Sequence, residues 1–119
     1  ILCNVIIKPL VNRTRPFDYV DTVVNLIVKA PTDPSFPSGH TGASFACASA
    51  LLFTKSKFWI PAAILATLIA FSRLYLYVHY PSDVLVGAVI GTITGILGTL
   101  VMKSVYEAIS ERNKRKLAK

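Results

Sequence analysis

Three apolar stretches, separated by short polar segments, dominate the hydrophobic pattern of the chain. Residues 41–54, 58–72 and 84–102 contain no Asp, Glu, Lys or Arg. A helix that crosses a lipid bilayer needs about 20 mainly apolar residues, with a lower limit of about 17. The third stretch meets that limit by itself, and the other two meet it if their helices extend over residues 38–54 and 58–77. The pattern therefore predicts three membrane-spanning helices.

A soluble bundle of buried helices is the alternative to a membrane bundle. The three stretches are apolar all round rather than along one face. This favours helices surrounded by lipid over helices with one face in water. Composition agrees, because 53% of the 119 residues are hydrophobic and only 16% are charged, against about 25% charged in average proteins. We therefore predict an all-α fold, an integral membrane helical bundle in which residues 1–119 form a single domain.

Small residues recur at every fourth position within each apolar stretch. They are Ser38, Gly42, Ala46 and Ala50 in the first, Ala62, Ala66 and Ala70 in the second, and Gly87, Gly91 and Gly95 in the third. Such stripes let helix backbones approach closely in lipid. Glycine costs about 1 kcal/mol inside a helix, so three glycines in register predict a tight helix contact.

The segments that flank the apolar stretches are polar or basic. Residues 1–11 are expected to be the end of a helix whose beginning precedes the chain. Residues 12–37 form a polar, proline-containing connection, within which residues 17–30 are expected to hold a short amphipathic helix at the membrane interface. Residues 103–119 are expected to be a helix end followed by a frayed basic tail.

The distribution of cations predicts the orientation in the membrane. The chain has 13 Lys and Arg against 6 Asp and Glu, a net charge of +7. Three crossings place the larger group of cations on one side: Lys55, Lys57, Lys103, Arg112, Lys114, Arg115, Lys116 and Lys119. By the positive-inside rule this side is cytoplasmic. We expect a multi-pass membrane protein with the opposite end facing the extracytoplasmic side, and the short, compact chain suggests a bacterial cell membrane.

The extracytoplasmic end collects an unusual set of residues from well-separated parts of the chain. They are Lys8, Arg13, Arg15, His40, Arg73 and His79, and they include both histidines of the protein. A cation at bilayer depth costs about 2.5–3.5 kcal/mol, so such residues tend to be functional. The alternative is that each one extends to the lipid headgroups. This alternative is kept for Arg13, which is therefore left out of the candidate site.

Two predicted helix starts carry local signals for anion binding and for a nucleophile. Ser38 is suited to an N-cap, and Gly39 lets a ligand approach the backbone amides at the positive end of the helix. Asp83 follows His79 by four residues, so its carboxylate could accept the Nδ1–H of the imidazole and leave Nε2 as a nucleophile. It could equally cap its own helix, and spacing alone does not separate the two roles.

Three motifs together resemble the signature of the type 2 phosphatidic acid phosphatase superfamily. They are Lys8-x6-Arg15-Pro16, then Pro37-Ser38-Gly39-His40, then Ser72-Arg73-x5-His79-x3-Asp83, and they occur in this order. The resemblance implies a helical membrane core of about six helices, of which this chain holds at most four. The N-terminal helices are therefore expected to be missing from residues 1–119.

The resemblance also implies a role for each motif residue. His79 would be the nucleophile that carries the phosphoryl group as a phosphohistidine, and Asp83 would orient it. His40 would protonate the leaving oxygen and later deprotonate the attacking water. The remaining motif residues would bind the phosphate oxygens: Lys8, Arg15, Arg73, Ser38 and the backbone N–H of Gly39.

Charge stabilisation by three cations predicts catalysis without a metal ion or other cofactor. Phosphoryl transfer requires mainly positioning and stabilisation of charge. A two-metal site would need a tight cluster of carboxylates, whereas Asp18, Asp21 and Asp33 are scattered through the connection.

The resemblance implies an integral membrane phosphatase that hydrolyses a lipid phosphomonoester or diphosphate. Undecaprenyl diphosphate is the first choice of substrate, followed by phosphatidylglycerophosphate and phosphatidate. The expected partners are this lipid phosphate and the bilayer; the apolar stretches argue against nucleic acid. Two alternatives remain: an enzyme like the vanadate-dependent peroxidases, whose known forms are soluble, and a non-catalytic protein that binds lipid phosphates.

Overall fold

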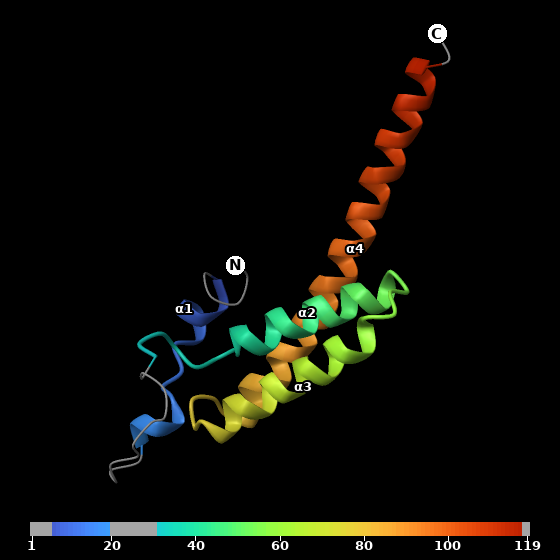
Figure 1. The fold of residues 1–119 in the computed structure, drawn as a ribbon. Helices are drawn as coiled ribbons and strands as arrows, with labels where there is room; N and C mark the ends of the chain where they lie inside the picture. The colour runs from blue at the N-terminus through green and yellow to red at the C-terminus, as the bar shows by residue number, and fades with distance from the viewer. Residues whose placement is uncertain (1–5, 20–30, 118–119) are drawn as a thin grey trace.

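The computed structural model describes residues 6–19 and 31–117, and the regular elements in this part of the chain are all helical. They are α1 (Lys8–Val11), the 3-10 helix η2 (Pro16–Tyr19), α2 (Gly39–Phe53), α3 (Trp59–Tyr75) and α4 (Pro81–Leu117) (Figure 1). The predicted all-α class is therefore confirmed for the described residues.

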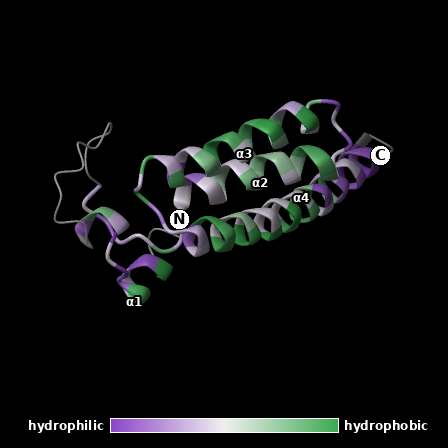
Figure 2. Cartoon of the chain, turned by 90° about the horizontal axis from the view of Figure 1, so that it is seen from below, coloured by the Kyte–Doolittle hydropathy of each residue, from purple (hydrophilic) through white to green (hydrophobic). Residues whose placement is uncertain are grey.

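Helix α2 packs against both α3 and α4, and the contact with α4 is the more extensive one. Figure 2 shows α2 beside α3 on one side and beside α4 on the other. Helices α2 and α4 run in parallel, because Ser38 lies against Gly87 and Gly42 lies against Gly91. Helix α4 continues well past the ends of its two neighbours (Figure 1).

The glycine stripe of α4 lies directly on the backbone of α2. A Cβ atom added to Gly87 would stand 2.6 Å from the carbonyl oxygen of Ser38. A Cβ on Gly91 or on Gly95 would meet the carbonyl oxygens of Gly42 and Ala46 even more closely. These separations are shorter than van der Waals contact, so only glycine fits. The predicted tight contact is confirmed, and it is a contact between backbones.

Helix α4 alone, among the described residues, is long and apolar enough to cross a membrane, over Pro81–Lys116. Helix α2 has 15 residues and α3 has 17, which rise about 22 and 26 Å at 1.5 Å per residue, against a hydrocarbon core of about 30 Å. Both are shorter than predicted because a left-handed residue follows each: Lys55 (φ 55°) after α2 and Tyr77 (φ 59°) after α3. Such residues end helices.

The prediction of a frayed basic tail is wrong as far as residue 117, because α4 continues through it as one 37-residue helix. Lys, Arg and Glu are good helix formers, and the basic last turn suits the negative end of the helix dipole. The amphipathic helix predicted for residues 17–30 lies mostly outside the described residues. Within the described part of the chain, only η2 overlaps this range.

Large apolar side chains point outward and small ones inward. The buried apolar residues are few and mostly small: Ala48, Ala66, Ala70 and Val78. Ile64, Leu68 and Phe71 on α3 are about three-fifths exposed. In Figure 2 the ribbon is coloured mainly hydrophobic along α3 and along the first part of α4. Soluble proteins have the opposite arrangement, whereas lipid-facing helices associate through small residues.

The backbone contact makes a specific prediction about two glycines of α4. We expect Gly91→Ala to destabilise the fold by about 1–3 kcal/mol, the usual cost of overpacking, because the new Cβ meets the Gly42 carbonyl. The matched control is Gly98→Ala, since a Cβ at Gly98 meets nothing within 4 Å and alanine is the better helix former by about 1 kcal/mol. Thermal unfolding in detergent measures both; equal effects of the two variants would contradict the contact.

Candidate active site

A cavity of about 260 Å³ opens at the end of the bundle where α2 begins, α3 ends and α4 begins. Its lining residues are Lys8, Arg15, Pro31, Asp33, Gly39, His40, Ala43, Arg73, Val78 and His79. Six of the eight sequence-predicted site residues are therefore brought to one cavity. The other two, Ser38 and Asp83, are fully buried directly behind it.

The start of α2 is fixed to the start of α4 by one backbone hydrogen bond. The N–H of Ser38 donates to the carbonyl oxygen of Asp83 at 3.0 Å. Ser38 is the N-cap residue of α2, but its hydroxyl makes no capping bond. It pairs instead with the hydroxyl of Thr41 at 2.9 Å. The fold thus presents Gly39 and His40 to the cavity while the Ser38 hydroxyl faces Thr41.

Arg15 is held at the cavity by three hydrogen bonds. Its guanidinium donates to the carbonyl oxygen of Val78 at 2.7 Å and to the backbone and carboxylate oxygens of Asp33, each at 2.9 Å. The side chain is only 4% exposed. The bond to Val78 joins the N-terminal segment to the loop that carries His79, so this cation is fixed beside the histidine.

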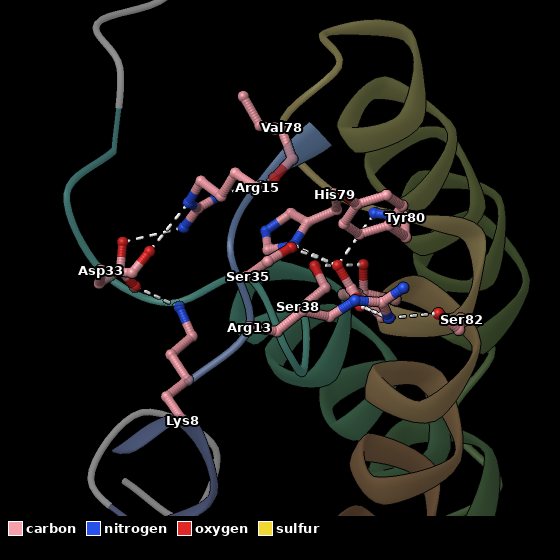
Figure 3. Close-up of polar contacts among 12 residues, drawn as sticks. Lys8, Arg13, Arg15, Asp33, Ser35, Ser38, Val78, His79, Tyr80 and Ser82 are labelled. Carbon is pink, nitrogen blue, oxygen red and sulfur yellow. Dashed lines mark hydrogen bonds and ion pairs between the residues drawn. The ribbon is translucent and has the colours of Figure 1, made fainter. Parts of the chain in front are cut away.

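Asp33 is the counter-ion of the cavity cations. Lys8 and Arg15 approach its carboxylate from two sides, as Figure 3 shows. Partial burial by itself would raise the pKa of Asp33, but the hydrogen bond and charge of Lys8 and the charge of Arg15 outweigh it and lower the pKa. A carboxylate thus lies between two of the three cations that the sequence assigns to phosphate.

His79 is a buried imidazole, 5% exposed, in the loop between α3 and α4. Its burial, reinforced by the charge of Arg15 and opposed by Asp83, lowers the pKa to about 4. His79 is therefore neutral at physiological pH. A buried neutral imidazole retains a lone pair on one ring nitrogen, which is what a nucleophile needs.

The surroundings of Nδ1 indicate which ring nitrogen of His79 carries the proton. Nδ1 lies 3.5 Å from Oδ2 of Asp83 and 3.5 Å from Oγ of Ser35. The Ser35 hydroxyl donates its own hydrogen to Asp83, so both neighbours of Nδ1 are acceptors. Their arrangement assigns the proton to Nδ1 and leaves Nε2 bare. The two separations are long, as catalytic hydrogen bonds often are before substrate binds.

Asp83 caps α4 and also lies beside His79, so its position is compatible with both of the roles that its spacing allowed. It occupies the third position of α4, and its Oδ2 accepts the backbone N–H of Tyr80 at 2.9 Å, as in half of a capping box. The same oxygen faces the Nδ1 of His79. Its other oxygen, Oδ1, pairs with Arg13 at 2.9 Å.

Sequence reasoning missed three side chains at this site. Arg13 was left out of the candidate site, but in the structure it pairs with the buried carboxylate of Asp83. Ser35 was not considered, and Asp33 was weighed only as a metal ligand. The available signal was proximity in sequence: Arg13 is two residues from Arg15, and Asp33 and Ser35 immediately precede the Pro37-Ser38-Gly39-His40 motif.

The remaining predicted residues lie toward the open side of the cavity. His40 is exposed, in the first turn of α2, and Arg73 is half-buried in the last turn of α3, where its Nε donates to the Ser72 hydroxyl at 3.3 Å. Three cations, two imidazoles and the N-terminus of α2 thus surround one space. Within residues 6–19 and 31–117, no three His, Cys, Asp or Glu side chains gather closely enough to hold a metal ion.

Comparisons of the sequence with known proteins find relatives that are named as lipid phosphatases. The chain is 40% identical over 86 residues to an undecaprenyl-diphosphatase of Sulfolobus acidocaldarius. This alignment covers 71% of this chain and 41% of the relative. It is 36% identical over 97 residues to the undecaprenyl-diphosphatase BcrC of Bacillus subtilis, and this alignment covers 82% of this chain and 49% of the relative. No solved structure matches the chain.

A third relative has a different named substrate. The chain is 42% identical over 93 residues to the decaprenylphosphoryl-5-phosphoribose phosphatase of Mycobacterium tuberculosis, 78% of this chain and half of the relative. The chain thus spans about half the length of the curated relatives it matches. Residues 1–107 match the PAP2 superfamily. With its three motifs gathered around one cavity, the chain belongs to the PAP2 superfamily of lipid phosphatases.

Proposed function

We propose that this chain carries the active site of a membrane-integral phosphatase that removes the terminal phosphate of a polyprenyl diphosphate. The observation that carries the proposal is the single cavity that joins neutral His79 to His40, Lys8, Arg15 and Arg73. Undecaprenyl diphosphate is the first choice because two of the relatives are named for it. Phosphatidylglycerophosphate and phosphatidate are the competing substrates.

The proposed reaction proceeds in two displacements. Nε2 of His79 attacks the terminal phosphorus, the bond from phosphorus to the bridging oxygen breaks, and His40 donates a proton to the lipid phosphate that leaves. His40 then takes a proton from water, whose oxygen attacks the phosphohistidine. Inorganic phosphate leaves, and both imidazoles return to their starting protonation states.

Lys8, Arg15 and Arg73 are proposed to hold the phosphate oxygens, together with the backbone N–H of Gly39. In the structure Asp33 lies between Lys8 and Arg15, so a phosphate must take over these contacts from a carboxylate. The hydroxyl of Ser38 would have to rotate away from Thr41 to join this set. Fixed positive groups of this kind stabilise the charge that develops in phosphoryl transfer.

A membrane location is proposed from the outward-facing apolar surface and from the length of α4. The cavity lies at the N-terminal end of α4, whereas the basic last turns lie at the other end. With the basic end on the cytoplasmic side, the cavity opens at the extracytoplasmic surface, where a polyprenyl chain could remain in the bilayer while its diphosphate enters.

The substrate assignment predicts the outcome of a panel of lipids. Protein reconstituted in liposomes is expected to release inorganic phosphate from undecaprenyl diphosphate faster than from phosphatidylglycerophosphate or phosphatidate, in excess EDTA. Cations of the chain supply the positive charge, so chelation should leave the rate unchanged. A malachite-green phosphate assay measures the release. Loss of turnover with EDTA would overturn the metal-free mechanism, and preference for a glycerolipid would overturn the substrate choice.

The nucleophile assignment predicts that His79→Ala lowers kcat at least about 10³-fold, because the imidazole that carries the phosphoryl group is removed. The control is Lys57→Ala, an exposed cation at the opposite end of the bundle, which should retain the full rate. Trapping with ³²P-labelled substrate should label the unmodified protein and not the His79→Ala variant. Near-normal turnover by His79→Ala would reject the assignment.

The lowered pKa of His79 predicts that its imidazole stays neutral as the pH falls through 6.5 and titrates near pH 4. An unfolded histidine binds a proton in this window and the folded one does not, so the stability of the fold falls as the pH drops from about 6.5 to 4. ¹⁵N NMR of a His40→Gln variant, in which His79 is the sole histidine, reports the titration directly. A midpoint near 6.5 in the folded protein would contradict the burial argument.

A further inference from the structure

A group of side chains on the far side of His79 from Asp33 has no role in the proposed reaction. Its centre is Arg13, whose Nη1 donates to Oδ1 of Asp83 at 2.9 Å and to the hydroxyl of Ser82 at 2.7 Å. The guanidinium also stacks over the ring of Tyr80, 4.0 Å from its centroid. Figure 3 shows Arg13 extending toward Ser82 and Tyr80, away from Lys8.

The charge of Asp83 requires a partner because this carboxylate is fully buried. A buried charge without compensation is strongly unfavourable. Arg13 supplies the positive charge and is itself about a third exposed, so it remains partly hydrated. No other ion pair with a Lys or Arg is formed by Asp83 among the described residues.

The two carboxylate oxygens of Asp83 have separate partners. Oδ1 pairs with Arg13, whereas Oδ2 accepts from Ser35 and from the Tyr80 N–H and faces the Nδ1 of His79. The Arg13 contact acts together with the two hydrogen bonds to Oδ2, and the three hold the carboxylate with Oδ2 toward the imidazole. The contacts with Tyr80 and Ser82 also hold Arg13 against the turn that follows His79.

We propose that Arg13 is a positioning residue: by binding Oδ1 of Asp83 it orients Oδ2 toward Nδ1–H of His79 and so keeps Nε2 bare and directed at the phosphate. This inference rests on the proposed function, in which His79 is the nucleophile. The inference goes beyond the proposed function because it gives the N-terminal segment a second role. Arg15 faces the cavity, and Arg13 acts through Asp83 on the opposite side of the imidazole.

The proposal predicts a change in kcat rather than in KM. Arg13→Gln should lower kcat for undecaprenyl diphosphate about 10- to 100-fold, by analogy with the loss of outer partners of metal-bound histidines, with KM within about twofold. Arg13→Lys, which keeps the charge, should recover most of the rate. Arg112→Gln removes the same charge from an exposed site on α4 and should leave both constants unchanged. A raised KM with normal kcat would show that Arg13 binds headgroups and overturn the proposal.

A double-mutant cycle separates positioning through Asp83 from a general structural role. In an Asp83→Asn background, Arg13→Gln should lower kcat by less than about threefold, because the interaction is already lost. Equal fold losses in both backgrounds would overturn the proposal.

A readout that does not depend on turnover distinguishes failure of this inference from failure of the proposed function. In the His40→Gln background, ¹⁵N NMR should show the Nδ1–H tautomer of His79, and Arg13→Gln should shift it toward a mixture of tautomers. An unchanged tautomer would overturn the positioning role even in an active protein. A shifted tautomer in a protein that releases no phosphate from any lipid would preserve the positioning role and reject the proposed function.

Discussion

The close approach of the α2 and α4 backbones is the constraint on which the rest of the structure depends. Three glycines of α4 lie against carbonyl oxygens of α2, and the N–H of Ser38 reaches the carbonyl of Asp83 at the same end. The two helix starts are thereby locked side by side in one register. His40 at the first start and His79 just before the second consequently line one cavity, although they are separated by a complete helical hairpin.

Charge balance around His79 follows from this arrangement. On one side Lys8 and Arg15 are compensated by Asp33, and on the other side Asp83 is compensated by Arg13. The imidazole lies between an electropositive cavity and a buried anion. The cavity cations and burial disfavour its protonation, and Asp83 only partly opposes them. The neutral state of His79 thus results first from its burial and second from the cavity cations, whose effect exceeds that of Asp83.

Much of this organisation was predictable from the sequence, for identifiable reasons. The four-residue spacing of Gly87, Gly91 and Gly95 predicted a backbone contact because helical periodicity places them on one face, and the structure has that contact. The ends of α2 and α3 were not predictable from hydropathy, because Lys55 and Tyr77 adopt left-handed conformations that an apolar pattern does not encode.

The partners Asp33, Ser35 and Arg13 were missed for a related reason. Each lies in a connection without helical or strand periodicity, so its position depends on where this connection is hydrogen-bonded to the helical bundle. The Arg15 bond to Val78 and the Ser38 bond to Asp83 make those attachments. Motif spacing identified the residues that face the cavity, whereas the residues behind them are set by tertiary contacts between segments distant in sequence.

The carboxylate of Asp33 between Lys8 and Arg15 has a consequence for selectivity. Any anion that enters must compete with an intramolecular rival, whose effective concentration far exceeds that of a free ligand. A singly charged phosphodiester, such as the headgroup of an ordinary bilayer lipid, offers these cations little more than the carboxylate already does. A terminal phosphate or diphosphate carries additional charge and additional oxygens. In the proposed function, a substrate phosphate would therefore have to displace the carboxylate of Asp33, and lipids that end in phosphate would be favoured over ordinary phosphodiester headgroups.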